Sequence, residues 1–434
     1  MFFDRKCVTI KLVIKLKEYA SFVEMLKEEL IPAMGCTEPI AIAYGASLCA
    51  HVLGEKTESV KALMSGNIIK NVKSVVVPNT GGLKGIEASI AAGIVAGNAD
   101  LKLEVISHVS DEQKMEITDF LKNHSIEVKP ATNKENLYIE ITCYGKEHEA
   151  TVVVSHTHTH VERIEKDHEP LFVDKKQKRE KKKDFSFMSV EKIVQFAGEV
   201  KIEDVKETLD RQIDYNMRIA QEGLNKDYGA SIGKVLLEYY GDDVKVKARA
   251  YAAAGSDARM GGCEMPVIIN SGSGNQGMTA SLPVIVYAKE ENLSDEKLYR
   301  ALVVSNLITI HLKKGLGRLS AYCGAVSAGC GAGCGIAYLH GGDFHLIAHT
   351  LVNALAIASG IVCDGAKPSC ASKIAVSVDA GIMGYFMALQ GKEFKNGEGL
   401  VLKGVENTIS NISRLSQKGM KKTDKEIIDM MCQY

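Results

Sequence analysis

The chain has 434 residues, 46% of them hydrophobic and 25% charged, with a formal net charge of −1 at pH 7. Such a chain can bury a large core without disulfide bonds and has the composition of a soluble globular protein. The balanced charge and the absence of Trp argue against binding to nucleic acid or to a membrane surface, so we expect a small-molecule partner.

The N-terminal region, residues 1–58, is expected to form helices that pack on a C-terminal domain. Apolar residues recur at helical spacing over 16–30, and the Lys and Glu among them interrupt any signal sequence. Pro39 suits only the first turn of a helix, so the motif MGCTEP at 34–39 predicts a helix that starts near Thr37. No apolar stretch is long enough to span a bilayer, and we therefore expect a cytoplasmic protein.

Residues 59–165 are expected to form an α+β domain. A helix is predicted over 85–96. Three histidines, His156, His158 and His160, alternate with Thr on a predicted strand and so share one face. That face could chelate zinc, border an active site or simply meet solvent. The runs that predict strands are 74–77, 101–106, 137–144 and 150–160.

Two further segments complete the expected organisation. Residues 166–187 are predicted to be a linker or loop, because the run DKKQKREKKKD at 174–184 has no apolar anchor. A patch for nucleic acid or a protein partner is the alternative for that run. From 188 to 434 the pattern is helical and rich in Ala, Gly and Ser, which predicts a compact, mostly α-helical C-terminal domain. The predicted fold class is thus α+β.

Eleven cysteines are present, and five of them fall in a 48-residue stretch near the C-terminus. In a cytosolic chain, clustered thiols indicate metal binding or catalysis rather than disulfides. The spacing lacks the CxxC pairs of a zinc ribbon, whereas Gly-rich surroundings suit a bulky iron–sulfur cluster. The alternatives are thiols that fill a tight helical core, or a zinc site. The five residues are Cys323, Cys330, Cys334, Cys363 and Cys370.

Cys36 is a separate candidate because it directly precedes the predicted helix start at Thr37. Unpaired amides and the helix dipole favour an anion at that position, so we expect the pKa of the Cys36 thiol to be lowered. A thiolate there would act as a nucleophile, a base or a metal ligand. The alternative is a buried thiol without a role.

The segment NSGSGNQG at 270–277 follows a strand-like run at 266–269. Its glycines allow the backbone amides to form an anion nest, and its side chains add neutral donors. We therefore expect a loop that binds a carboxylate or a phosphate; a plain tight turn is the alternative. The predicted binding residues are Ser271, Ser273, Asn275 and Gln276.

Arg259 lies in a second predicted loop, at 255–262. Its guanidinium has the geometry to clamp a carboxylate through two hydrogen bonds. An ion pair with Asp257 or Glu264 is the favoured interpretation for this residue.

The motif at 34–39, the segment SGSGNQG at 271–277 and the late cysteines together resemble the L-cysteine desulfidase family, which is related to the iron–sulfur L-serine dehydratases of the alpha-chain type. The resemblance extends from about residue 23 to about residue 420. It implies a [4Fe–4S] cluster held by three cysteines, two of them seven residues apart and the third about forty residues earlier. The residues that match this spacing are Cys323, Cys363 and Cys370.

The resemblance also implies the activity: β-elimination of L-cysteine to pyruvate, ammonia and hydrogen sulfide, with no pyridoxal phosphate. The helical domain would carry the cluster, whose iron without a protein ligand polarises the Cβ–S bond. Cys36 would remove the Cα proton, and the loop at 271–277 would hold the substrate carboxylate. Cys330, Cys334 and the basic insertion around 175–183 depart from the family pattern.

Other functions remain open at the level of sequence. An iron–sulfur L-serine dehydratase would use the same residues, and a pyridoxal-phosphate lyase would use SGSGNQG to bind phosphate. A non-catalytic iron–sulfur sensor is the alternative from another class. We expect the protein to form a homo-oligomer, most simply a dimer, with neither nucleic acid nor a membrane as a partner.

Overall fold

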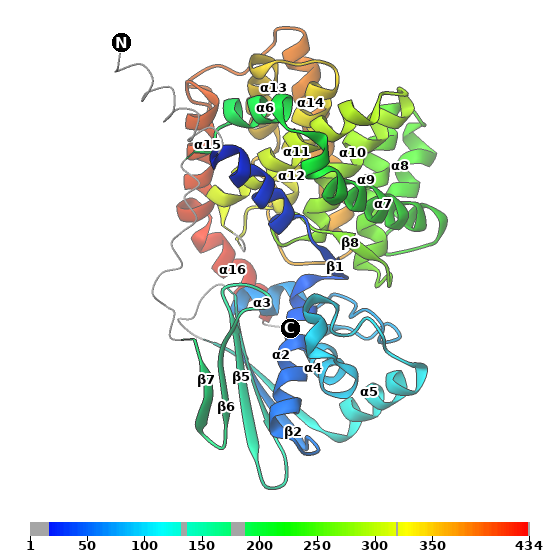
Figure 1. Cartoon of the computed structure of the whole chain (residues 1–434), viewed down its shortest axis with the longest axis vertical. Helices are drawn as coiled ribbons and strands as arrows, with labels where there is room; N and C mark the ends of the chain where they lie inside the picture. Colours follow the sequence, from blue (N-terminus) through cyan, green and yellow to red (C-terminus); the bar gives the residue numbers. More distant parts are fainter. Residues whose placement is uncertain (1–16, 132–136, 175–186, 318–319, 433–434) are drawn as a thin grey trace.

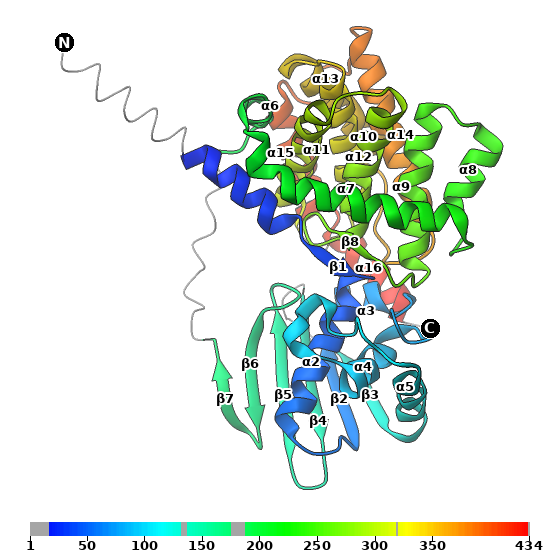
Figure 2. The same cartoon turned by 45° about the vertical axis from the view of Figure 1, so that its right-hand side comes forward.

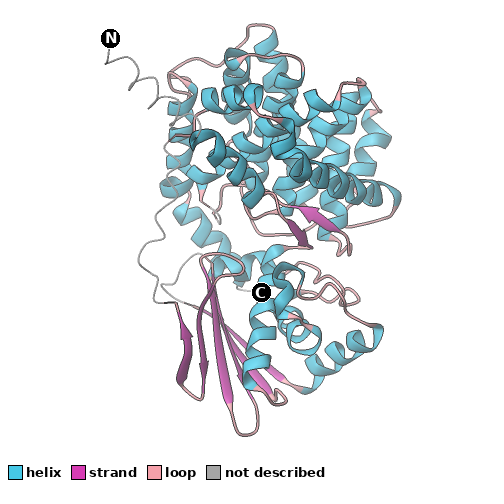
Figure 3. Cartoon of the chain, viewed as in Figure 1, coloured by secondary structure: helices cyan, strands magenta, loops and turns pink. Residues whose placement is uncertain are grey.

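The structure, a computed structural model, describes residues 17–131, 137–174, 187–317 and 320–432. A large helical domain lies above a smaller domain in which helices cover a sheet (Figure 1). Nearly all of the strand structure belongs to the smaller domain (Figure 3). The predicted α+β fold class, with a mostly helical C-terminal region, is therefore confirmed.

The smaller domain is built on a six-stranded mixed sheet in the order β3-β2-β4-β5-β6-β7. β2 and β3 pair in parallel, and every other neighbouring pair is antiparallel. Every second residue of β2 is buried, because helices cover one face of the sheet. The strands are β2 (Ser59–Met64), β3 (Ser125–Pro130), β4 (Tyr138–Tyr144), β5 (Glu149–Ser155), β6 (Val161–Lys166) and β7 (Glu169–Val173).

Helices account for most of the described chain. Those of the smaller domain are α2 (Thr37–Leu53), α3 (Gly66–Val72), α4 (Gly85–Ala96), η1 (Ala99–Glu104) and α5 (Asp111–Asn123). The first part of the helical domain contains α6 (Val190–Glu199), α7 (Ile202–Asn225), α8 (Ile232–Tyr240), α9 (Val244–Met260), α10 (Gly274–Glu290) and α11 (Asp295–Leu316). The remainder is α12 (Gly324–Leu339), α13 (Phe344–Ala358), α14 (Cys370–Leu389), α15 (Val405–Arg414), η2 (Leu415–Gly419) and α16 (Lys421–Cys432).

Each domain has its own hydrophobic core, and the N-terminal segment contributes to both. The helix over 17–29, as predicted, precedes Pro32 and buries Phe22 and Leu26 in the core of the helical domain. α2 instead packs on β4 and β5 in the core of the smaller domain. The segment 1–58 is thus divided between the two cores, whereas we expected it to pack on the C-terminal domain.

The two domains meet at a short antiparallel ladder. β1 (Pro32–Met34) pairs with β8 (Pro266–Ile268) at the lower edge of the helical domain, directly above α2 (Figure 2). α16 also reaches the smaller domain, where Lys70 of α3 forms a 2.6 Å ion pair with Asp424. The chain therefore connects the domains at both ends of its sequence.

Several predicted strands have a different structure. The run 101–106 was expected to be extended, but it overlaps the 3₁₀ helix η1, because the Asn98 side chain accepts a hydrogen bond from the Asp100 amide and starts a turn. The run 74–77 contributes only an isolated bridge between Val76 and Lys84. β4 and the helix over 85–96 agree with the predictions.

The predicted linker over 166–187 also differs. β6 and β7 form a hairpin that continues the sheet to Val173, so the sheet extends beyond the predicted domain limit at 165. The basic residues 175–183 lie outside the described residues. Their expected role as a solvated loop stays a prediction.

α14 is the one described helix that is long and apolar enough to cross a membrane. Half of its apolar window is buried inside the protein, against α9, α12 and α13. Because half of α14 packs against other helices of the domain, it is a core helix.

The crossing of α12 and α14 depends on glycine. A Cβ atom on Gly381 would lie 2.2 Å from the carbonyl oxygen of Gly329, and a Cβ on Gly333 would lie 2.4 Å from the Gly381 carbonyl oxygen. The two backbones therefore touch, with no room for side chains between them. Cys323 and Cys370 stand at the starts of these two helices.

We predict that Gly381→Ala lowers the free energy of unfolding by about 1–3 kcal/mol, because the added methyl group forces the two helices apart. Urea denaturation followed by circular dichroism measures the effect. Gly360→Ala is the control, since a Cβ there meets nothing within 4 Å. Equal midpoints for the two variants would contradict the close contact.

Candidate functional site

The eight residues predicted to be the base, the carboxylate-binding residues and the cluster ligands all lie around one cavity of about 110 Å³ between the two domains. The start of α2 and helix α3 form one wall, and the starts of α10, α12 and α14 form the other. The structure thus brings together segments that are more than 300 residues apart. The eight are Cys36, Ser271, Ser273, Asn275, Gln276, Cys323, Cys363 and Cys370.

Cys36 is the N-cap residue of α2, as the sequence predicts. Its thiol is buried and donates a 3.1 Å hydrogen bond to Oε2 of Glu38. The expectation of a lowered pKa was wrong. Burial, and then the negative charge of Glu38, raise the pKa of Cys36 well above its usual value, although Arg259 acts in the opposite direction. In this site Cys36 is a thiol that donates to a carboxylate.

Among the residues that the structure describes, Glu38 is the only acidic side chain on the cavity wall, and the sequence analysis did not single it out. Its Oε1 accepts a hydrogen bond from Asn71 (3.0 Å), and its Oε2 accepts one from Cys36 (3.1 Å). The Thr37 hydroxyl lies 3.1 Å from both Oε2 and the Gly272 carbonyl, and its one proton serves one of these acceptors at a time. Burial alone raises the pKa of Glu38, but the charge of His158 and the Cys36 hydrogen bond outweigh it, so the pKa lies below its usual range. Glu38 is a buried, ionised carboxylate.

The cysteines Cys323, Cys363 and Cys370, called the cysteine trio below, are held by local backbone structure. The Cys323 amide donates to the Ile361 carbonyl (3.2 Å), and the Cys363 amide donates to the Ala321 carbonyl (2.7 Å). This pairing holds the two cysteines on adjacent segments, and both line the cavity. Cys370 opens α14 seven residues after Cys363 and also lines the cavity.

The cysteine trio has the donor chemistry for an iron–sulfur cluster. Among the residues that the structure describes, no three His, Cys, Asp or Glu side chains converge on the position of a single metal ion. A cubane cluster has no such requirement, because each thiolate binds a different iron. Burial, and then the charge of Cys363, raise the pKa of Cys323 to about 12, which a bound cationic core would reverse. The trio therefore fits a cluster better than a zinc ion.

Cys330 and Cys334 are the surplus cysteines of the late group. Both lie inside α12, fully buried in the core of the helical domain, and neither lines the cavity. Burial raises the pKa of each thiol. These two residues match the interpretation of cysteine as a small apolar core residue.

The segment 271–277 forms the start of α10 together with the turn that precedes it. Asn270 and Ser273 exchange backbone hydrogen bonds of 3.1 Å, and Ser271 and Gly272 take positive φ angles of 51° and 81°. Ser273 is the N-cap of α10 but does not cap it with its hydroxyl. The first amides of α10 are therefore available to an anion at the cavity wall.

Arg259 lies beside this helix start and differs from its favoured interpretation. Its Nη1 donates to Oδ1 of Asn275 (3.1 Å), its Nε has no hydrogen-bond partner in the described part of the chain, and no ion pair forms with Asp257 or Glu264. Residues two apart on a helix point to different sides, so Asp257 and Arg259 do not meet. Asp257 instead accepts a hydrogen bond from the Gly233 amide (3.0 Å). The guanidinium is thus oriented toward the cavity.

Two amide oxygens of the wall also lack partners among the described residues. They are Oδ1 of Asn67, on α3, and Oε1 of Gln276, in the first turn of α10. A buried acceptor without a donor is costly unless a ligand supplies one. Together with Glu38, these oxygens form an acceptor-rich region that suits an ammonium group.

The three histidines do not share the face of one strand. β5 ends at Ser155, and a turn follows in which the Ser155 amide donates to the His160 carbonyl (3.0 Å). His158 lines the cavity, whereas His160 contacts Asp174 at 3.0 Å and His156 is exposed. The positive φ of 64° at His156 starts this turn, which the alternating pattern could not reveal.

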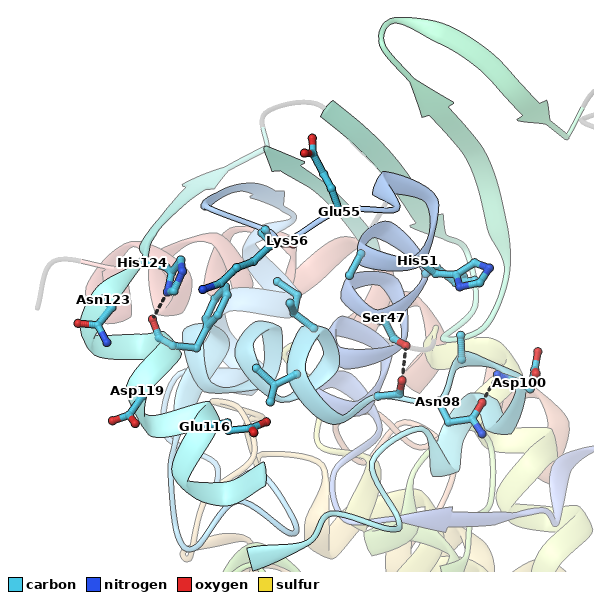
Figure 4. A pocket seen from close by; sticks show the side chains of 18 residues that line it. Ser47, His51, Glu55, Lys56, Asn98, Asp100, Glu116, Asp119, Asn123 and His124 are labelled. Carbon is cyan, nitrogen blue, oxygen red and sulfur yellow. Dashed lines mark hydrogen bonds between the residues drawn. The ribbon is translucent and has the colours of Figure 1, made fainter. Parts of the chain in front are cut away.

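A larger hollow of about 960 Å³ lies in the smaller domain between α2, α4, η1 and α5 (Figure 4). Its wall mixes acids such as Glu116 and Asp119 with Lys56 and His124, and it contains none of the cysteines. Because its charged groups are spread around an open hollow, we place the chemistry in the smaller cavity.

Three further wall residues were missed by sequence reasoning: Glu38, Lys70 and Lys313. For Glu38 the signal was present, because it lies in the motif 34–39. Lys313 belongs to the helical run of α11 and is almost completely buried. Burial lowers the pKa of Lys313, while the charges of Cys363, Cys323 and Glu38 act to raise it.

The comparisons with known proteins agree on the family of this chain. The serine dehydratase alpha chain family matches residues 100–429. A UPF0597 protein of Desulfitobacterium hafniense is 59% identical to this chain, over 95% of the chain and 96% of its own length. A UPF0597 protein of Lachnoclostridium phytofermentans is 49% identical, over 95% of the chain and 99% of its own length. A UPF0597 protein of Bacteroides fragilis is 36% identical over 95% of the chain and 98% of its own length.

We predict that Glu38→Gln makes the Cys36 thiol of the metal-free protein more reactive. The neutral amide removes the negative charge that raises the pKa of Cys36, so a larger fraction is thiolate at any given pH. The rate of alkylation of the Cys36 peptide by iodoacetamide at pH 8, measured by mass spectrometry, should rise roughly three- to ten-fold. Glu112→Gln, on the exposed start of α5, is the control. An unchanged rate in Glu38→Gln would contradict this electrostatic coupling.

Proposed function

We propose that this chain, which belongs to the UPF0597 family and contains a serine dehydratase alpha chain domain, is an iron–sulfur-dependent lyase that releases sulfide from L-cysteine. The serine dehydratase alpha chain family is iron–sulfur dependent, and an amino-acid lyase is the activity that this domain indicates. The proposal goes beyond this family-level activity in naming L-cysteine as the substrate.

The observation that carries the proposal is the composition of the cavity wall. Three thiols and the start of α10 lie on the wall formed by the helical domain, and the start of α2, with Cys36 and Glu38, lies on the other wall. One wall offers soft ligands for a metal cluster, and the other offers charged and polar groups of both signs. A small zwitterion that is also bound through sulfur matches this combination.

The substrate is proposed to bind through both of its charged groups. The first amides of α10 and the guanidinium of Arg259 would receive the carboxylate. Glu38, with the unpaired oxygens of Asn67 and Gln276, would receive the ammonium group. These contacts would hold the Cα–H bond in a fixed orientation, which is what elimination requires.

The cysteine trio, Cys323, Cys363 and Cys370, would hold a [4Fe–4S] cluster. When bound, a cluster with one iron free of protein ligands supplies a Lewis acid for the β-sulfur of the substrate. Cys36, deprotonated before the reaction, would remove the Cα proton and so become the thiol that donates its hydrogen bond to Glu38. The Cα electron pair forms the Cα–Cβ double bond, sulfide leaves with the Cβ–S pair, and 2-aminoacrylate hydrolyses to pyruvate and ammonia.

L-Serine is the second candidate substrate, because the matching domain is that of the serine dehydratase alpha chain. An anaerobic assay of L-cysteine and L-serine at equal concentrations decides between them through pyruvate formation. We expect the larger kcat/KM for L-cysteine, with sulfide and pyruvate in equal amounts. A larger kcat/KM for L-serine would overturn the choice of substrate. No turnover of either amino acid would favour a non-catalytic iron–sulfur sensor.

The cellular setting follows from the same proposal. An oxygen-sensitive cluster is best maintained in a reducing compartment, so we propose a cytoplasmic enzyme with a small amino acid as its partner. The homodimer expected from the sequence stays a prediction.

The first prediction from this proposal concerns the cluster ligands. Anaerobically purified protein should contain about four iron and four sulfide per chain. Ala substitution of Cys323, Cys363 or Cys370 should remove most of both, as iron and sulfide analysis will show. Cys330→Ala and Cys334→Ala are matched controls, because these thiols are buried in α12 away from the cavity. Normal iron content in Cys370→Ala would remove that residue from the ligand set.

The second prediction concerns Cys36. A serine hydroxyl is too weak an acid to form the required anion, so Cys36→Ser should lower kcat roughly 10²–10⁴-fold. Iron content should stay unchanged, and L-cysteine should still perturb the visible spectrum. Loss of iron would instead make Cys36 a ligand, and near-normal turnover would exclude it as the base.

A further inference from the structure

A buried lysine faces the cavity without an ionic partner. Lys313 lies on α11, less than one turn before the helix ends at Leu316, and only 5% of its surface is exposed. Within the described ranges, its ammonium group makes neither a hydrogen bond nor an ion pair. Such a charge is unfavourable in a protein interior unless something else compensates it.

The other cations at this site do have partners. Lys70 forms its 2.6 Å ion pair with Asp424, and Lys373 contacts Asp364 and donates to the Val362 carbonyl (3.0 Å). Arg259 donates to Asn275. Among the described lysines and arginines that line the cavity, Arg259 retains one hydrogen bond and an unpaired Nε, whereas the Lys313 ammonium group has no partner at all.

The charges that act most strongly on Lys313 are those of Cys363 and Cys323, followed by Glu38. Glu38 already accepts hydrogen bonds from Cys36 and Asn71, and in the proposed function it also receives the substrate ammonium group. The anions left for Lys313 are those that the cysteine trio would carry. Lys313 and the trio line the same cavity.

The formal charges agree with this pairing. Among the described wall residues, Lys70 is paired with Asp424 and the charge of Arg259 is offset by that of Glu38, so Lys313 is a cation without an offsetting anion. Three thiolates around a [4Fe–4S] core that carries two positive charges leave one negative charge. The occupied site would therefore supply the negative charge that Lys313 lacks.

We propose that Lys313 is the counter-ion of the cluster held by the cysteine trio, an inference that rests on the proposed function. Its role is to retain the cluster and to set its reduction potential, and it takes no part in proton transfer. The same lysine destabilises the metal-free protein, because its charge is then buried without compensation.

Lys313→Met tests this role, because it removes the charge and keeps a long, unbranched side chain. Lys313→Arg keeps the charge, and Lys314→Met removes the charge of the exposed neighbour on the same helix. Three properties are measured for each protein: the melting temperature of the metal-free form, the rate of iron loss to a chelator under anaerobic conditions, and the reduction potential of the cluster.

We expect metal-free Lys313→Met to melt at a higher temperature than the wild type. Its cluster should be lost about ten-fold faster or more, and should have a more negative reduction potential, since a nearby positive charge favours the reduced form. Lys313→Arg and Lys314→Met should behave as the wild type in iron loss.

Three results would overturn the inference. A lower melting temperature of metal-free Lys313→Met, with unchanged iron loss, would mean that the lysine only supports the fold. A raised KM for L-cysteine with normal iron loss would mean that it binds the substrate carboxylate. Wild-type protein that holds no iron would overturn the proposed function and this inference together, whereas iron retained equally by wild type and Lys313→Met overturns the inference alone.

Discussion

The ladder between β1 and β8 is the contact on which the candidate site depends. It pairs Pro32 with Ile268 and Met34 with Pro266, so the chain that enters α2 runs beside the chain that enters α10. The Thr37 hydroxyl then donates to the Gly272 carbonyl (3.1 Å), which fixes the two helix starts side by side. Without this pairing the helix starts would belong to two separate domains, each with its own core and neither with a complete site.

A buried polar site of this kind lowers the stability of a fold. The cavity wall contains one carboxylate, several cations and amide oxygens without partners, all enclosed between two hydrophobic cores. Groups of this sort are retained where a ligand or a cofactor completes their interactions. The glycine contact between α12 and α14 also lowers stability, because glycines contribute no side-chain packing. The same contact brings the starts of the two helices close together.

Sequence patterns predicted the parts of this structure that depend on local rules. Pro39 located the start of α2, the small residues of the C-terminal half indicated tightly packed helices, and β8 followed from the run 266–269, whereas the expected loop 270–277 contains the first turn of α10. The resemblance, rather than the spacing, selected the trio among five late cysteines. Local rules failed at Cys36. Helix geometry predicted a lowered thiol pKa, but burial and the charge of Glu38 raise that pKa. Lys313 gave no signal, because a lysine in a helix is ordinarily exposed.

The order of the segments along the chain has a consequence for biosynthesis. The cavity wall begins at Cys36 and ends at Ile374, and α16, which contacts α3 behind that wall, finishes at Cys432. A nascent chain on the ribosome can fold the sheet domain early, but it has no complete cavity until nearly all of its codons have been translated. Insertion of the proposed cluster would therefore follow synthesis, and oxygen encountered before that step would meet three free thiols.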